Sequence, residues 1–213
     1  RGHSYQMDYD VIIIGGGPIG CAVARDIAVA GFRVLVAEEH PQIGDPLRCA
    51  GLVSSRTLQL SGVSSKVIRH KLTGARVHAP GGEVLNLYGS RVYAVAVDRV
   101  AFDRDLAVQA AAAGAEITRS MRAVDLRLVS GGVRVKLRQR GSQDKTKECT
   151  CRLVVGADGY RSLVARRLGV LPKGEKVPLY AAEVDLPGSE GQIVDIFLGN
   201  QVAPGWFGWV IPT

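Results

Sequence analysis

One stretch of the chain, Asp10 to Glu39, constrains its fold more than any other. It begins with a short apolar run rich in β-branched residues, as expected for a buried parallel strand. A glycine turn of the pattern G-x-G-x-x-G follows at once, then a helix expected over 19–30 and a second strand expected over 33–37. This order of strand, turn, helix and strand opens a Rossmann-like fold. The sequence therefore predicts an α/β fold class with a parallel sheet.

The glycine turn predicts a site for the pyrophosphate of a dinucleotide. Gly15 permits a tight turn, Gly17 lets the backbone approach the ligand, and Gly20 allows the helix to pack closely on the strand. The helix that follows directs its N-terminal N–H groups at the phosphates. Glu38 or Glu39, at the end of the second strand, can accept the ribose hydroxyls. Because an acid there disfavours a 2′-phosphate, FAD or NAD is a better candidate than NADP.

The composition is that of an ordinary globular chain. Its 213 residues are 46% hydrophobic and 22% charged, and no apolar run approaches the length of a transmembrane helix. The four cysteines suggest no disulfide framework, which favours a reducing compartment such as the cytoplasm. Cys149 and Cys151 share a strand face but lack a second pair of ligands, so no metal site is expected.

The formal net charge of +7 is concentrated in one region. Residues 119–147 contain nine basic side chains against Asp125 and Asp144, and much of this charge lies on the basic strand Arg134–Arg140. A solvated strand face is the simpler interpretation. The alternative is attraction to an anionic membrane surface or an acidic partner. Nucleic acid is less favoured, because no aromatic residues are interleaved with the charges.

Further strands and helices are expected around the first unit. Residues 66–97 are typical of strands, 98–114 of a helix, 123–155 of a β-meander and 179–213 of more strands, among them Tyr180–Leu186.

These elements predict two domains. A dinucleotide-binding domain is expected over 7–172, with a strand-rich excursion at 66–97 that contributes to the second domain. Residues 173–213 are expected to start this second, mainly β domain, which is expected to be truncated.

Asp158 lies in a second glycine-containing turn, Gly156–Gly159, at the carboxyl end of an apolar strand. Ligands of α/β proteins bind at such ends, so Asp158 is a candidate for the ligand site. The alternative is that it caps the helix opened by Ser162.

Cys49 lies in the loop after the second strand, beside Arg48. A neighbouring arginine favours a thiolate, which would make the thiol reactive. A cysteine that only packs against its neighbours is the better supported interpretation from sequence.

Several motifs together resemble the flavoprotein monooxygenase and reductase superfamily that includes para-hydroxybenzoate hydroxylase. They are GGGPIG with Glu38, GADGYRS, and an R-x-x-F-D-x-x-L-A pattern in VDRVAFDRDLAVQ. Within that superfamily, DPLRCAGLVS and APGWFGWVIP resemble the geranylgeranyl reductase family, which carries an R-C-A/G loop and a Y-x-W-x-F-P motif. Phe207 and Ile211 depart from that motif, and the same segment also resembles the W-x-W-x-I-P motif of flavin-dependent halogenases.

The resemblance covers essentially residues 7–213. It implies a Rossmann-like FAD-binding domain with an inserted β-meander, followed by the start of a mainly β substrate domain, with FAD as cofactor. The implied reaction is hydride delivery from reduced flavin to an isoprenoid C=C bond, followed by protonation. The implied partners are a prenyl lipid or other hydrophobic small molecule and an electron donor, either NAD(P)H or ferredoxin. The implied location is the cytoplasm, with peripheral contact to a membrane left open.

By the same resemblance, the cofactor site draws on several separate segments. Its residues would be Gly15, Gly17, Pro18, Ile19 and Gly20 at the pyrophosphate, Glu38 and Glu39 at the ribose, Arg48, Cys49, Ala50 and Gly51 on the flavin side, Arg99 at the cofactor, Ala123 on the adenine side, and Asp158 with Gly159 at the second turn. Cys49 is also the candidate catalytic residue. Phe207 and Trp209 would wall an apolar pocket for the prenyl chain.

Two alternative functions stay open. The first is a flavin-dependent monooxygenase or halogenase of an aromatic substrate. The second is a truncated nucleotide-binding fragment without activity, because a further G-D motif of the superfamily has no candidate after Trp209.

Overall fold

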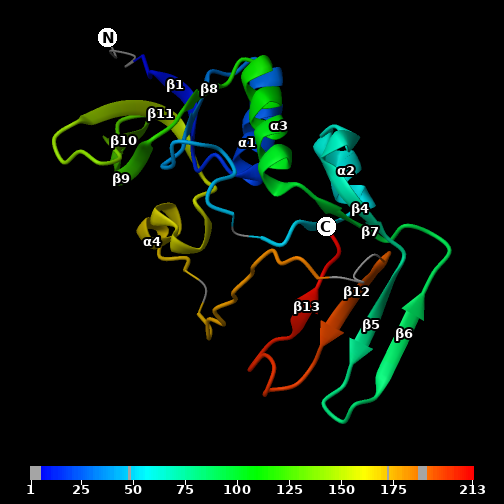
Figure 1. The fold of residues 1–213 in the computed structure, drawn as a ribbon. Coiled ribbons are helices and arrows are strands. Elements are labelled where there is room, and N and C mark those ends of the chain that lie inside the picture. The colour runs from blue at the N-terminus through cyan, green and yellow to red at the C-terminus, as the bar shows by residue number, and fades with distance from the viewer. Residues whose placement is uncertain (1–5, 48, 172, 187–190) are drawn as a thin grey trace. The chain divides into compact units, whose positions relative to one another are not determined.

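The computed structural model describes residues 6–47, 49–171, 173–186 and 191–213, and it forms two compact units (Figure 1). The first unit contains the chain up to Pro46 together with Val100–Lys173. The second contains Leu47–Arg99 and Gly174–Thr213. The excursion between the two parts of the first unit therefore begins earlier than the strands at 66–97.

A six-stranded sheet of the order β8-β2-β1-β11-β10-β9 forms the centre of the first unit. Its strands are β1 (Tyr9–Ile14), β2 (Val34–Ala37), β8 (Glu116–Thr118), β9 (Met121–Val129), β10 (Gly132–Gln139) and β11 (Thr146–Gly156). Strands β8, β2, β1 and β11 are parallel, whereas β10 and β9 continue the sheet in antiparallel fashion. The predicted β-meander is thus joined to the parallel sheet, because its last strand pairs with β1. This architecture confirms the predicted Rossmann-like α/β fold.

Two long helices, α1 (Pro18–Val29) and α3 (Arg99–Ala112), lie side by side (Figure 1), and α3 belongs to the first unit from Val100 onward. Arg25 on α1 donates to Gln109 Oε1 on α3 at 2.9 Å, which ties the two helices together. A shorter helix, α4 (Leu163–Leu168), follows β11 after the short 3₁₀ turn Gly159–Arg161. The predicted helices of this unit are therefore confirmed to within a residue or two at their ends.

The core of the first unit explains why its central strands are continuous apolar runs. Ile12, Ile13 and Leu35 are almost completely buried, as expected for parallel strands covered on both faces. Cys149 and Cys151 of β11 are buried in the same cluster as Ile12. They are free thiols that act as small apolar residues in the core.

The second unit contains two smaller sheets. One is antiparallel, with β7 (Ala94–Val97) between β3 (Leu52–Ser54) and β4 (Ile68–Leu72). The other has the order β13-β12-β5-β6, made of β13 (Gly208–Val210), β12 (Ile193–Phe197), β5 (Gly74–His78) and β6 (Val84–Tyr88). Helix α2 (Ser55–Ser61) is capped by Ser54, whose hydroxyl accepts a hydrogen bond from Thr57 N at 3.0 Å.

The expectation of a strand at Tyr180–Leu186 is wrong. This segment has irregular backbone, and its polar and apolar residues are exposed alike. The alternation of residue types there does not mark a buried face. Without such a face, alternation alone does not produce a strand.

Candidate cofactor site

The glycine loop between β1 and α1 has no room for side chains at two of its positions. Gly15 has a φ of +103°, and a Cβ there would overlap the carbonyl oxygen of Ala157. A Cβ on Gly20 would overlap the carbonyl oxygen of Gly15 itself. These two glycines therefore let the loop turn sharply and let α1 pack on it, as the motif predicts.

Gly17 is different, because a Cβ there would meet nothing within 4 Å. It is the N-cap residue of α1, and it offers no side chain to bond the first N–H groups of that helix. The first turn also holds no acidic residue. Open space, uncapped N–H donors and the positive end of the helix dipole meet at this point. The geometry fits a diphosphate.

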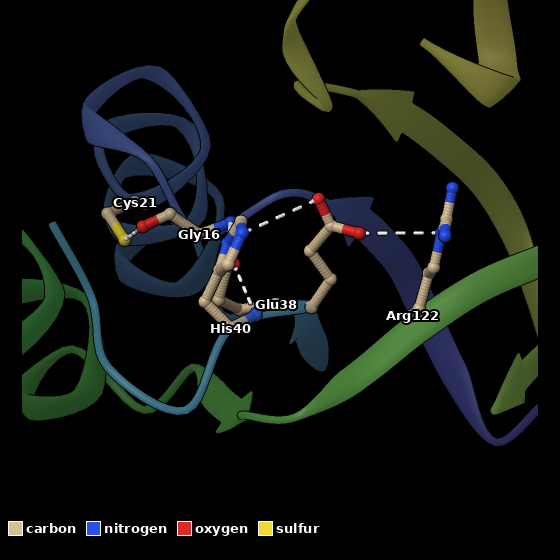
Figure 2. Close-up of polar contacts among 6 residues, drawn as sticks. Gly16, Cys21, Glu38, His40 and Arg122 are labelled. Carbon is tan, nitrogen blue, oxygen red and sulfur yellow. Dashed lines mark hydrogen bonds and ion pairs between the residues drawn. The ribbon is translucent and has the colours of Figure 1, made fainter. Parts of the chain in front are cut away.

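Glu38 directly follows β2, and its side chain reaches back to the glycine loop (Figure 2). Its Oε2 accepts a hydrogen bond from Gly16 N at 2.7 Å, and its Oε1 accepts one from His40 N at 2.7 Å. The residue is only 8% exposed. The carboxylate therefore belongs to the loop structure and lies at its edge. His40 was not singled out from the sequence, since no pattern marks it.

The start of β9 runs beside the segment that follows β2. Residues predicted at the adenine and ribose therefore lie near one another. Met121 N donates to the Glu38 carbonyl at 2.8 Å, so Arg122 and the buried Ala123 follow directly. Arg122 Nε lies 3.4 Å from Glu39 Oε2. The structure thus places the start of β9, which contains Ala123, beside Glu38 and Glu39. Arg122 could have been found only from the register of the meander.

Cys21, in the first turn of α1, stabilises the glycine loop. Its Sγ donates to the Gly16 carbonyl at 3.2 Å, and its side chain is completely buried (Figure 2). Burial raises the pKa of this thiol to about 12, so it stays protonated at neutral pH. The peptide groups on both sides of Gly16 are therefore held, one by Glu38 and the other by Cys21.

Asp158 contacts both the helix after it and the backbone near the glycine loop. Its Oδ1 accepts from Ser162 Oγ at 2.5 Å, and its Oδ2 accepts from Leu163 N at 2.6 Å. Its Cα would lie 3.1 Å from a Cβ on Gly15. The capping interpretation is thus supported by direct contacts. A role toward the cofactor stays a prediction for Asp158 and for the adjacent Gly159.

From Leu47 onward, the loop after β2 belongs to the second unit, and Arg48 lies outside the described residues. Cys49 is exposed, so the interpretation of it as a packing residue is wrong. Ala50 is half-buried, and Gly51, with a φ of +79°, accepts from Val97 N at 2.9 Å.

A Cβ on Gly51 would also lie 3.1 Å from Arg99 Cγ. The structure therefore joins the predicted Gly51 and Arg99 within this unit. Their roles at the cofactor, like that of Cys49, stay predictions.

Phe207 and Trp209 lie together near the end of the chain, with their rings in an edge-to-face arrangement at 6.2 Å between centroids. Trp209 pairs with Ile196, which pairs with Val77, which pairs with Leu85. Paired residues project from the same face of a sheet. One face of the β13-β12-β5-β6 sheet therefore carries an apolar row across all four strands.

The opposite face of that sheet carries a charged cluster. Arg76 binds Asp195 through two hydrogen bonds of 2.8 and 2.7 Å, and His78 Nε2 lies 2.7 Å from the same carboxylate. The hydrogen bond from Arg76 is the main cause that lowers the pKa of Asp195 below its usual value. The predicted aromatic pair thus faces away from this charged cluster.

The described residues contain neither a membrane-spanning helix nor a metal cluster. No helix there is both long and apolar enough to cross a membrane. No group of three or more His, Cys, Asp or Glu side chains in that part of the chain could hold a metal ion.

A comparison with protein families places this site in a known group. The model of the FAD-binding domain family matches residues 8–206 of the chain. The chain belongs to the FAD-binding domain family. Its cofactor is FAD, and the glycine loop, with open space at Gly17 in front of an uncapped helix, fits the pyrophosphate of that group.

Three of the matched proteins are informative: one is named a reductase, one is reductase-like and one is a hydroxylase. Digeranylgeranylglycerophospholipid reductase of Methanothrix thermoacetophila is 34% identical over 97% of this chain and 54% of its own length. The crystal structure of a geranylgeranyl bacteriochlorophyll reductase-like protein from Thermoplasma acidophilum is 27% identical, with a TM-score of 0.77 over 96% of this chain and 53% of that one. Anhydrotetracycline hydroxylase from Streptomyces rimosus is 30% identical, with a TM-score of 0.63 over 79% of this chain and 35% of its own. The chain spans about half the length of the curated relatives it matches.

Proposed function

We propose that this chain is the FAD-binding part of a reductase of the geranylgeranyl type, which saturates C=C bonds of a prenyl lipid. The observation that carries the proposal is the extent of the similarity. The reductase relatives align with 96–97% of the chain and so include both units, whereas the hydroxylase aligns with 79%. A monooxygenase of an aromatic substrate is the weaker alternative for that reason.

Within this proposal the two units have separate tasks. The glycine loop and the N-terminus of α1 hold the pyrophosphate, and Glu38 holds the adenosine ribose. FAD, when bound and reduced by NAD(P)H or ferredoxin, would supply the hydride for one carbon of the double bond, and a proton from solvent would add to the other. Phe207 and Trp209 orient the prenyl chain, and their apolar face excludes water from it.

The test is anaerobic. The protein is loaded with FAD, reduced with dithionite, and mixed with a geranylgeranyl lipid. We expect the absorbance of oxidised flavin to return and the lipid to gain two hydrogen atoms for each flavin that is reoxidised, measured by mass spectrometry. Cys49→Ser should slow this reoxidation if the exposed thiol acts near the flavin. Reoxidation that requires oxygen and hydroxylates an aromatic compound would replace the proposal with the monooxygenase alternative.

We also propose that the outer face of the β-meander contacts an anionic membrane surface. Cross-strand pairing puts Arg134 of β10 beside Arg127, and Arg138 beside Arg122, with Lys136 between them on the same face. The side chains of Arg122, Arg127 and Arg134 are 65, 78 and 50% exposed. Each of these three arginines has a carboxylate partner: Arg122 Nε lies 3.4 Å from Glu39, Arg127 Nε 2.8 Å from Asp125 and Arg134 Nε 3.8 Å from Glu148. The basic side chains still outnumber these acids, and a lipid substrate would bring the protein to a membrane.

Charge reversal tests this contact. Each basic residue near an anionic surface contributes ~1 kcal/mol, so the triple variant R134E/K136E/R138E should bind vesicles containing phosphatidylglycerol ~100-fold more weakly. The matched control is R56E/K66E/K176E, which makes the same change of net charge at exposed sites of the second unit. Equal binding by the two variants in a sedimentation assay would contradict the proposal. Binding to RNA but not to vesicles would also contradict it.

A further inference from the structure

His40 is the most closely bound neighbour of the Glu38 carboxylate, and none of the predictions from the sequence uses it. Its backbone N and its ring Nδ1 lie 2.7 and 2.6 Å from the same oxygen, Glu38 Oε1 (Figure 2). We propose that His40 is a positioning residue, which holds the Glu38 carboxylate in the orientation that binds the adenosine ribose of FAD. The proposal rests on the assignment of Glu38 to the ribose.

The carboxylate is held on both sides. Gly16 N donates to Oε2 at 2.7 Å, while the two His40 donors converge on Oε1. The side chains of Glu38 and His40 are 10 and 17% exposed, so few waters compete for these bonds. A carboxylate offers about four lone-pair sites, and three are used here. One acceptor site is left for a ribose hydroxyl, in a carboxylate that cannot easily rotate.

The position of the proton on the His40 imidazole is set by its hydrogen bond to Glu38. An ionised carboxylate only accepts hydrogen bonds, so the ring must carry its hydrogen on Nδ1 to bond Glu38. The other ring nitrogen, Nε2, lies 3.8 Å from Glu39 Oε1, so the ring stands between two carboxylates. Arg122 Nε, 3.4 Å from the other oxygen of Glu39, balances part of this negative charge.

The backbone fixes His40 independently of its ring. The His40 carbonyl accepts a hydrogen bond from Ser120 N at 3.0 Å, and the Glu38 carbonyl accepts one from Met121 N at 2.8 Å. The segment from Glu38 to His40 is thereby attached to the connection between β8 and β9. Removal of the imidazole alone should leave this attachment and the His40 N–H bond in place. The loss would be confined to the Nδ1 donor and to the orientation it gives the carboxylate.

Two substitutions distinguish a positioning role of His40 from a purely structural one. His40→Ala removes the ring donor. His40→Asn restores a donor, because the Asn side-chain NH₂ can occupy the place of Nδ1. The readout is recognition of the ribose by the 213-residue chain freed of bound nucleotide. Calorimetric titrations measure the Kd of ADP and of its 2′-deoxy and 3′-deoxy analogues. The ratio of the Kd of each analogue to the Kd of ADP reports the hydrogen bond that the missing hydroxyl would donate to Glu38.

We expect the wild type to bind ADP more tightly than at least one deoxy analogue. His40→Ala should weaken ADP about tenfold and the discriminated deoxy analogue much less, while His40→Asn should regain most of the discrimination. Circular dichroism and thermal unfolding check that both variants fold. A structural role alone would weaken ADP and the analogues equally.

Three results would overturn the proposal. They are an equal loss for ADP and its analogues in His40→Ala, a His40→Asn variant no better than His40→Ala, and a wild type that does not discriminate the analogues. Glu38→Ala serves as the reference, since it should abolish the discrimination. If Glu38→Ala keeps it, the ribose assignment fails, whereas the proposed reductase activity is unaffected and is tested by its own assay.

Discussion

Substitution of Gly17 by alanine is expected to abolish nucleotide binding while the fold stays intact. Gly17 has φ −71° and ψ −176°, a conformation that alanine adopts readily, and a Cβ there meets no protein atom within 4 Å. The methyl group would instead enter the space in front of α1 that fits the pyrophosphate. Because backbone N–H groups must approach the phosphates closely, we expect the Kd for FAD to rise by ~100-fold or more. Stability should change by less than ~1 kcal/mol.

The contrast with Gly15→Ala makes this prediction sharp. Gly15 has positive φ, and its Cβ would overlap the Ala157 carbonyl, so this variant should lose stability as well as binding, the positive φ alone costing ~1–2 kcal/mol. Gly174→Ala, where the added Cβ also meets nothing, controls for loss of a glycine elsewhere. Flavin fluorescence titration and urea unfolding measure the two quantities. If Gly17→Ala binds FAD as the wild type does, the phosphates do not lie in front of α1.

Local rules were sufficient to predict the part of the fold whose geometry fits the phosphates. The strand, the glycine turn and the helix lie next to one another in the sequence, and the motif itself supplies a steric reason for each glycine. The carboxylate after β2 is also set by spacing alone. These features depend on short-range geometry, so their positions in the structure agree closely with those predicted from the sequence.

Features that depend on register or on tertiary packing could not be predicted in the same way. The side chain of Trp209 shares a face with Val77 rather than with Arg76 only because of the pairing of three strands. His40 contacts Glu38 because the chain bends after β2, and no residue pattern predicts that bend.

Burial was equally hard to predict from residue type. Cys21 and Cys49 have the same side chain, yet the first is buried beneath the loop and the second is exposed. The alternation of residue types in Tyr180–Leu186 is typical of a strand, but this segment does not form one. In both cases the deciding factor was the neighbouring structure, which the sequence does not display.

Asp158 gives the second large expected effect, this time on stability. Its carboxylate receives hydrogen bonds from Ser162 Oγ and from Leu163 N, and it lies at the start of the segment that leads into α4. Asp158→Ala should lower the free energy of unfolding by ~2 kcal/mol, because a charged acceptor is lost while its half-buried donors remain. Ser162→Ala removes the N-cap of α4, whose hydroxyl accepts from Ala165 N at 2.9 Å, and should cost ~1 kcal/mol.

The same variants decide whether Asp158 also serves the cofactor. Ser162 is the matched control, because it shares the cap but was not predicted at the cofactor site. If Asp158 only caps the helix, FAD titrated into the folded variants should bind Asp158→Ala and Ser162→Ala with nearly equal affinity. If Asp158 also organises the cofactor, Asp158→Ala should bind FAD at least ~10-fold more weakly than Ser162→Ala, since a charged hydrogen bond contributes that much. The contact of this turn with Gly15 leads us to expect the second result.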